Sequence, residues 1–191
     1  MTLRDLLIQR AARLQEQIAL TAPGWEPLRY PAFRNRVEGV ALGLMAGGPA
    51  LGTPVFCATG GPWDWASEVA CACCGLVWAP GGAPVPAAVL GGTRFNDEAG
   101  RQAYHDREHD LEDTTLLGSG LDHGELLRRL RRLNGRFGWD HATEVTLPME
   151  QLGTAELRGA LWSALYAGSH ALLVPGKGKD WDQATFMGLL E

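Results

Sequence analysis

Lysine is almost missing from this chain of 191 residues. Its 17 basic residues are 15 arginines and only two lysines, Lys177 and Lys179. A lysine supplies a compact positive charge for a phosphate, or an amine for a Schiff base or a general base. Because no lysine precedes residue 177, most of the chain cannot perform lysine chemistry.

Long hydrophobic runs, a targeting signal and an excess of positive charge are missing too. No apolar run reaches the roughly 18 residues that a membrane-spanning helix needs. Residues 1–5, Met-Thr-Leu-Arg-Asp, carry an early acid, unlike a signal peptide. The net charge of −5 gives no general attraction to nucleic acid or to an anionic membrane. We therefore expect neither nucleic acid nor a membrane as a partner.

Cysteine is scarce and clustered. The four cysteines are Cys57, Cys71, Cys73 and Cys74. This spacing is unlike the disulfide framework of a secreted protein, so we expect a cytoplasmic protein. Cys71 and Cys74 form a Cys-x-x-Cys pair, but at the C-terminal end of a predicted apolar helix, where the helix dipole does not lower a thiol pKa. We expect buried thiols rather than a redox pair or a zinc site.

The rest of the composition is typical of one globular domain. Apolar residues make up 46% of the chain and charged residues 20%, and a chain of this length can bury most of its apolar surface. We expect a single α/β domain over residues 1–191, with an N-terminal section (residues 1–92), an acidic connector (residues 93–113) and a C-terminal section (residues 114–191). The connector holds seven acids and few apolar residues, which predicts a solvated, partly helical segment.

Hydrophobic periodicity predicts alternating helices and strands. The predicted helices cover residues 2–17, 31 to the glycines at 47 and 48, 62–74, 123–136, 154–167, and the residues from Asp180 onward. The predicted strands cover residues 18–20, 28–30, 54–58, 76–79, 114–117, 143–147 and 170–174. This alternation favours the α/β class, with a mainly parallel sheet that carries helices on both faces in three layers.

A glycine turn inside residues 114–124 is the main candidate site. The run Thr-Thr-Leu-Leu-Gly-Ser-Gly-Leu-Asp-His-Gly joins a predicted strand to a predicted helix. Proteins of the α/β class use such turns to bring backbone N–H groups and a positive helix end to a phosphate. Gly118, Ser119 and Gly120 are therefore the candidate cofactor-binding residues.

Two other interpretations of the same turn remain open. Gly118-x-Gly120-x-x-x-Gly124 also resembles a loosened dinucleotide fingerprint, for which Glu150 is the nearest candidate acid. Alternatively, the glycines serve only a tight turn that needs positive φ, with Asp122 or Ser119 as the helix N-cap. We favour the tight turn.

The order of elements and several local runs resemble the adenylate-forming superfamily of acyl-CoA synthetases, peptide-synthetase adenylation domains and luciferases. The resemblance depends on Ile18-Ala19-Leu20, Tyr30, Gly52-Thr53-Pro54-Val55, the helix that ends at Gly75, Val77-Trp78-Ala79-Pro80, Leu147-Pro148-Met149, Leu172-Leu173-Val174-Pro175 and Asp180-Trp181-Asp182. It covers most of this chain but only the beginning of a family member. It implies the fold of a reduced N-terminal domain of such an enzyme.

The departures from the family concern its chemistry. Family members carry a Thr-Ser-Gly-Thr-Thr-Gly-x-Pro-Lys-Gly phosphate loop between a strand and a helix. Here only Gly118-Ser119-Gly120 remains, without the hydroxyl run and the lysine, and Asp122 would place a negative charge where a triphosphate should lie. The sequence ends at Glu191, so we expect no counterpart of the family's later nucleotide motifs or of its catalytic lysine. The resemblance therefore supplies no catalytic residue, and we expect no cofactor, ATP and AMP included.

The acidic connector contains a second candidate site. His105-Asp106-Arg107-Glu108-His109 reads His-x-x-Glu-His, the inverted zincin motif. On one helix, His105 and His109 could share a metal ion with Glu108 as the base. The polar flanks argue against a shielded catalytic cavity, so we interpret the motif as a charged surface.

A run of arginines follows the glycine turn, on the predicted helix 123–136. They are Arg128, Arg129, Arg131, Arg132 and Arg136. They lie on the flank away from the apolar face, and the predicted role is a solvated or ion-paired surface.

These observations leave three functional hypotheses. The favoured one is a shortened, non-catalytic relative of AMP-binding acyl-CoA synthetase-like enzymes that acts by binding or assembly, as a homodimer or with a partner protein that covers the truncated sheet. The second is a ligase that keeps nucleotide or acyl-group binding, or one subunit of a split adenylate-forming synthetase. The third is a metal-dependent hydrolase that uses His105, Glu108 and His109.

Overall fold

The structure is a computed structural model that describes residues 1–90, 98–179 and 181–191. Its helices are α1 (Leu3–Arg13), α2 (Tyr30–Met45), α3 (Pro62–Cys74), α4 (Ala87–Leu90), α5 (Glu98–Asp106), α6 (His123–Phe137) and α7 (Ala155–Ala167). Its strands are β1 (Ile18–Thr21), β2 (Leu28–Arg29), β3 (Pro54–Phe56), β4 (Val77–Trp78), β5 (Ala83–Pro84), β6 (Glu144–Pro148) and β7 (His170–Val174). Short 3-10 helices lie at η1 (Arg107–His109), η2 (Leu111–Asp113), η3 (Met149–Gln151) and η4 (Gln183–Phe186).

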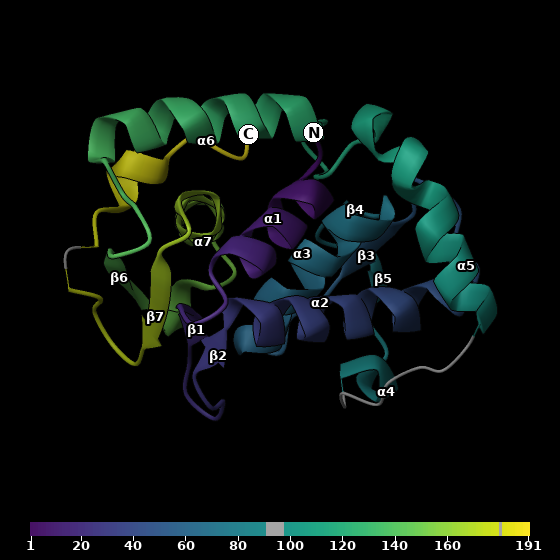
Figure 1. Ribbon diagram of the computed structural model, residues 1–191, viewed down its shortest axis with the longest axis horizontal. Helices are drawn as coiled ribbons and strands as arrows, with labels where there is room; N and C mark the ends of the chain where they lie inside the picture. Colours follow the sequence, from purple (N-terminus) through teal and green to yellow (C-terminus); the bar gives the residue numbers. More distant parts are fainter. Residues whose placement is uncertain (91–97, 180) are drawn as a thin grey trace.

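The strands form two sheets, where we expected one. A four-stranded sheet has the order β2-β1-β7-β6, and a three-stranded sheet has the order β4-β3-β5. Strands β1 and β2 pair antiparallel, whereas the β1–β7, β6–β7, β3–β4 and β3–β5 pairs are parallel. The predicted α/β class with mainly parallel strands is therefore confirmed. Figure 1 shows the four-stranded sheet on the left and the three-stranded sheet on the right, connected by helices.

Helix α3 explains why two sheets are present. Almost every residue of α3 is buried, including all those from Asp64 to Cys74, and a helix that is buried all round must be covered on more than one side. Strands β3 and β4 contact α3, as do helices α1 and α2. On α3, Trp65 also meets Trp162 of α7 edge to face, with the ring centroids 4.8 Å apart. The helices α2, α3 and α7 thus lie between the two sheets, since α2 contacts β1 and β2 and α7 contacts β6 and β7.

The N-terminal and C-terminal sections of the chain share their buried apolar surface. One cluster of buried side chains extends from Leu3 to Leu190 and includes Leu126 and Leu130 of α6. In the portion of the chain that the structure describes, no helix has both the length and the apolar character to cross a membrane.

Several predicted boundaries differ from the structure. The first helix ends at Arg13 rather than at residue 17, with Leu14 as its C-cap. Within the predicted connector, residues 98–113 form α5, η1 and η2, while residues 93–97 lie outside the described residues. Asp180, the predicted start of the last helix, also lies outside them, and the residues that follow contain only the 3-10 helix η4.

A buried ion pair joins α3 to α7. Arg158 donates to Glu68 through Nε (2.6 Å to Oε2) and Nη2 (3.1 Å to Oε1), and Trp162 Nε1 donates to the same Oε1 at 2.9 Å. Glu68 is only 2% exposed. The carboxylate is therefore compensated within the core by a guanidinium and an indole N–H.

We predict that Glu68→Gln lowers the free energy of unfolding by about 3 kcal/mol, because the guanidinium of Arg158, whose side chain is only 13% exposed, then loses its counter-charge. The matched control is Glu38→Gln, which removes the carboxylate of the part-exposed Arg34–Glu38 pair within α2 and should cost less than about 1 kcal/mol. Urea unfolding of both variants measures the difference. Equal losses in the two variants would contradict the assigned role of Glu68.

A buried histidine joins α6 to the start of α1. The Leu3 N–H donates to His123 Nδ1 at 3.1 Å, and His123 is 1% exposed. Its Nε2 has no hydrogen-bond partner among the described residues. Burial disfavours the imidazolium and lowers the pKa of His123 from 6.5 to about 4. The folded protein therefore holds this imidazole in its neutral form at neutral pH.

We predict that His123 makes the protein acid-sensitive between pH 6.5 and about 4. In that interval the unfolded chain binds a proton at His123 and the folded chain does not, so stability falls as the pH falls, by roughly 3 kcal/mol over the whole interval. His123→Asn keeps an acceptor near the position of Nδ1 and should flatten this dependence by about one proton. Denaturant unfolding at several pH values measures it, with the exposed His141→Asn as the control. Identical pH slopes for the wild type and His123→Asn would disprove this assignment.

Candidate functional site

The glycine turn lies at the edge of the three-stranded sheet. The Trp78 N–H of β4 donates to Leu116 O at 2.8 Å, and the Gly118 N–H donates back to Trp78 O at 3.2 Å. The predicted strand 114–117 is wrong in extent, because only isolated bridges form, between Trp78 and Leu117 and between Thr115 and Asp122. The chain reverses immediately, with the Leu116 N–H donating to Leu121 O at 2.7 Å, so no longer ladder develops beside β4.

Both glycines of the turn have a geometric role. Gly120 has a φ of 87°, in the left-handed region that favours glycine, and its N–H donates to Leu117 O at 2.9 Å. A Cβ on Gly118 would lie 3.3 Å from the Cβ of Ala79, which is tighter than most side-chain contacts. The geometry of a tight turn therefore accounts for both glycines without a ligand.

Asp122 is the N-cap of α6. Its Oδ1 accepts the Glu125 N–H at 2.7 Å. This hydrogen bond uses one of the backbone N–H groups that a phosphate at the helix N-terminus would need. The carboxylate also adds negative charge there. The structure therefore selects Asp122 over Ser119 as the cap.

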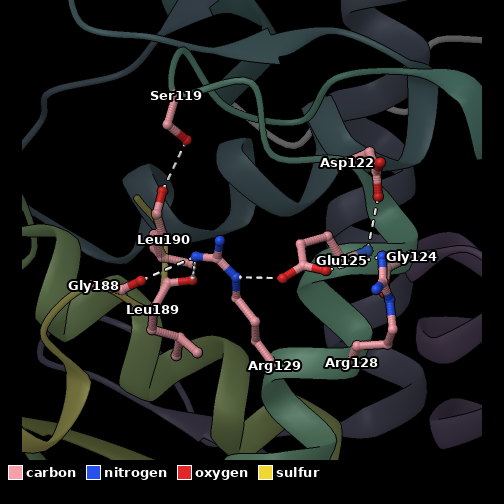
Figure 2. A network of polar contacts seen from close by, with 9 residues as sticks. All are labelled: Ser119, Asp122, Gly124, Glu125, Arg128, Arg129, Gly188, Leu189 and Leu190. Carbon is pink, nitrogen blue, oxygen red and sulfur yellow. Dashed lines mark hydrogen bonds and ion pairs between the residues drawn. The ribbon is translucent and has the colours of Figure 1, made fainter.

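The hydroxyl of Ser119 is engaged with the C-terminal segment, residues 188–190. Ser119 Oγ donates to Leu190 O at 2.9 Å, as Figure 2 shows. From α6, Arg129 Nη1 donates to Gly188 O at 3.0 Å and to Leu189 O at 3.1 Å. The C-terminal segment is thus held against the turn and the adjoining helix by two side chains.

Glu125 organises the basic side of this network. Its Oε1 accepts Arg129 Nε at 2.9 Å, and its Oε2 lies 2.9 Å from Arg128 Nη2. The hydrogen bond from Arg129 lowers the pKa of Glu125. Figure 2 shows that Asp122, Glu125 and Arg129 connect the turn to residues 188–190 in one polar chain. Arg129 is thereby oriented toward the C-terminal segment.

A groove of about 670 Å³ lies beside the turn, and we call it the acidic groove. It is lined by Leu51, Gly52, Val77, Asp110, Thr114, Thr115, Leu117, Gly118 and Gly120. Among these described lining residues Asp110 is the single charged one, and it is an acid. The groove has the volume of a small-molecule site, but its charge opposes an anion.

The candidate metal motif does not lie on one helix. Helix α5 ends at Asp106, so His105 belongs to α5 while Glu108 and His109 lie in the 3-10 helix η1. Across the residues that the structure describes, no three His, Cys, Asp or Glu side chains are grouped so that they could hold a metal ion. His105 instead lies against the ring of Tyr104, with the ring centroids 5.9 Å apart.

The cysteines are buried, as predicted. Cys57, Cys71, Cys73 and Cys74 are all buried and free. Burial raises the pKa of the Cys57 thiol to about 11 and that of Cys74 to about 12. Neither thiol of the Cys71–Cys74 pair is therefore a thiolate at neutral pH.

Three arginines of the run, Arg129, Arg132 and Arg136, line a second groove, of about 420 Å³, which we call the basic groove. Its lining consists of Glu125, Arg129, Arg132, Leu133, Arg136, Thr185, Met187, Gly188 and Leu189. Sequence reasoning found the arginines but not the groove, because its other wall comes from the C-terminal segment and the residues just before it. Glu150, the candidate acid of a dinucleotide site, accepts the Gly176 N–H at 2.7 Å instead.

No protein-family model and no curated protein sequence matches this chain. Solved structures do match its fold. A protein described as a long-chain-fatty-acid CoA ligase from Rhodopseudomonas palustris aligns with a TM-score of 0.65 at 16% identity, over 91% of this chain and 57% of its own. The N-terminal subdomain of NpsA from Klebsiella oxytoca aligns with a TM-score of 0.63 at 16% identity, over 94% and 55% of the two chains.

A third match is a fatty acyl-adenylate ligase from L. pneumophila, in complex with acyl adenylate and pyrophosphate. It has a TM-score of 0.61 and 14% identity, over 91% of this chain and 39% of the ligase. The chain thus spans between 39% and 57% of the length of these three structures. Its fold is that of the N-terminal portion of adenylate-forming enzymes, as the sequence resemblance predicted.

Proposed function

We propose that this protein is a non-catalytic relative of AMP-binding acyl-CoA synthetase-like enzymes, and that it acts by binding or assembly. It forms a homodimer or associates with a partner protein. We place it in the cytoplasm, in keeping with its four free and buried cysteines.

The hydrogen bond from Ser119 to Leu190 O is the observation that carries this proposal. A phosphate site at a glycine turn needs hydroxyls, backbone N–H groups and a helix N-terminus directed at the ligand. Here the hydroxyl is bonded to the C-terminal segment, the Gly118 and Gly120 amides donate to carbonyls, and the Glu125 amide donates to Asp122. The groups that would grip a phosphate serve the chain's own structure.

Charge around the turn supports the same conclusion. Asp122 lies at the N-terminus of α6, and Asp110 lines the acidic groove. The nearby arginine, Arg129, is held by Glu125 and by the carbonyls of residues 188 and 189. A triphosphate here would meet two carboxylates before it met a free cation.

A second candidate function is a ligase that keeps nucleotide or acyl-group binding, alone or as one subunit of a split synthetase. The acidic groove favours it, because a volume of about 670 Å³ beside two glycines is within the range of small-molecule sites. An uncharged acyl group fits its lining of Leu51, Val77 and Leu117 better than a nucleotide does.

We predict that the thermal stability of the protein is unchanged by ATP with Mg²⁺, by AMP and by acyl-CoA. Each ligand is added at about 100 times the Kd of an ordinary ligand site. A ligand that did bind at that excess would stabilise the folded state by about 2.7 kcal/mol. Differential scanning calorimetry with each ligand measures this. A rise in Tm with ATP or AMP would refute the non-catalytic assignment, whereas a rise with acyl-CoA alone would favour the second candidate.

A matched variant distinguishes two reasons why a triphosphate would not bind: the negative charge of Asp122, and the hydrogen bonds that the turn already makes within the chain. Asp122→Asn keeps an N-cap acceptor for Glu125 and removes the negative charge. We expect no stabilisation by ATP in this variant either, because Ser119 and the turn amides stay occupied. Stabilisation of Asp122→Asn alone would identify the Asp122 charge as the group that excludes the triphosphate.

A further inference from the structure

The basic groove lies in a surface with the composition of a protein interface. Arg132 and Arg136 are exposed, and among the described residues neither has an ion-pair or hydrogen-bond partner. Beside them the two large apolar side chains Phe137 and Met187 are 41% and 67% exposed. Exposed aromatic, methionine and arginine side chains together are typical of contact surfaces between proteins.

The acidic groove belongs to a surface of opposite charge. Asp106, Glu108, Asp110 and Glu112, in the segment from α5 to η2, are all exposed. Glu112 forms an ion pair with the N-terminal ammonium of Met1. The guanidinium of the neighbouring Arg107 donates to the carbonyls of Cys74 and Pro49 rather than to the other three acids. Asp110 lines the groove together with Leu51, an apolar side chain that is 43% exposed.

Both grooves adjoin the glycine turn, since Gly118 and Gly120 line the acidic groove and the C-terminal segment, bonded to Ser119, lines the basic groove. The charged ends of the two surfaces, however, lie far apart. In Figure 1, in which the longest axis is horizontal, α5 forms the right-hand edge. Helix α6 begins near the N-terminus and runs to the left, so its C-terminal end, with Arg136 and Phe137, is at the opposite end. Among the described residues, no ion pair joins Arg132 or Arg136 to the acids of the α5–η2 segment of the same copy.

We infer that a second copy of this chain is the partner, and that the basic groove of each copy docks on the acidic groove of the other. This inference rests on the proposed function, since it names the assembly through which the protein acts. A two-fold axis forms both contacts at once, because each copy contributes one surface of each kind and both surfaces adjoin the same glycine turn. Arg132 and Arg136 face Glu108 and Asp110 of the other copy, and Met187 packs against Leu51.

The arrangement also bears on the glycine turn. Gly118 and Gly120 line the acidic groove, so docking of the second copy covers the side of the turn that its own C-terminal segment leaves open. The ion pairs are exposed at the rim and set orientation and association rate, while the apolar side chains supply the buried contact. High salt therefore weakens the dimer without abolishing it.

Paired charge reversals test this geometry. Sedimentation equilibrium of the wild-type chain at micromolar concentration should show a dimer. Arg132→Glu/Arg136→Glu and, separately, Glu108→Arg/Asp110→Arg should each raise the dimer dissociation constant at least tenfold. Met187→Ser should weaken the dimer without changing any charge. The matched control, Arg13→Glu/Arg131→Glu, makes the same charge change at two exposed arginines outside both grooves and should leave the dimer intact.

Mixing the two reversed variants is the decisive step. In a mixed pair both contacts again join opposite charges, so the heterodimer should form with near wild-type affinity while each variant alone stays monomeric. Native mass spectrometry identifies the mixed species, and circular dichroism shows that each variant is folded. A monomeric wild type, reversed variants that dimerise like the wild type, or a mixture that does not re-associate would each overturn the inference. None of these results alters the ligand calorimetry, so failure of the proposed function is detected separately.

Discussion

The burial of α3 on all sides is the constraint on which the rest of the fold depends. A helix with no polar face cannot cover one side of a sheet and expose the other to water, so it requires packing partners all round. Strands β3 and β4 cover one side, and α1, α2 and the Trp162 side chain of α7 cover the others. The carboxylate of Glu68, deep in this layer, then needs an internal cation, which Arg158 supplies.

This central layer also determines where the glycine turn lies. Strand β4 follows α3 directly, and the turn is bonded to β4 through Trp78. The C-terminal segment reaches the same place, because Leu189 packs close to Gly159 of α7 and Leu190 accepts the Ser119 hydroxyl. The glycine turn is therefore fixed between the sheet edge, α6 and the segment. Its polar groups are satisfied by neighbours that the fold brings to it.

Local patterns in the sequence predicted most elements and the fold class. Helix 62–74 and strand 170–174 have their predicted bounds, because apolar periodicity and the flanking Gly75 and Ser169 act within a few residues. The division into two sheets was not predictable in this way. It depends on β1 pairing with β7, about 150 residues later in the chain. The same limit applies to strand 114–117, whose only sheet neighbour among the described residues is the short β4.

In the candidate site, too, the features that depend on neighbouring residues were predictable from the sequence, and the long-range contacts were not. The roles of Gly118, Gly120 and Asp122 follow from turn geometry and helix capping, which are local properties of the sequence. The contacts that occupy the turn join residues 71 apart, as in Ser119–Leu190, or 60 apart, as in Arg129–Leu189. No motif spacing encodes such contacts. The absence of a lysine and of a hydroxyl run at the turn was visible in the sequence, whereas the bonds from the turn to the chain's own C-terminal segment were not.

The fold separates the acidic residues from the arginines that follow them in the sequence. Along the chain, the acids of residues 98–112 and the arginines of residues 128–136 are near neighbours, and the sequence predicted a solvated or ion-paired surface for the arginines. The turn and the length of α6 instead carry Arg132 and Arg136 away from Glu108 and Asp110. A molecule with opposite charges and exposed apolar side chains at its two ends is complementary to itself. In the dimer that we propose, association of two copies brings both pairs of surfaces into contact.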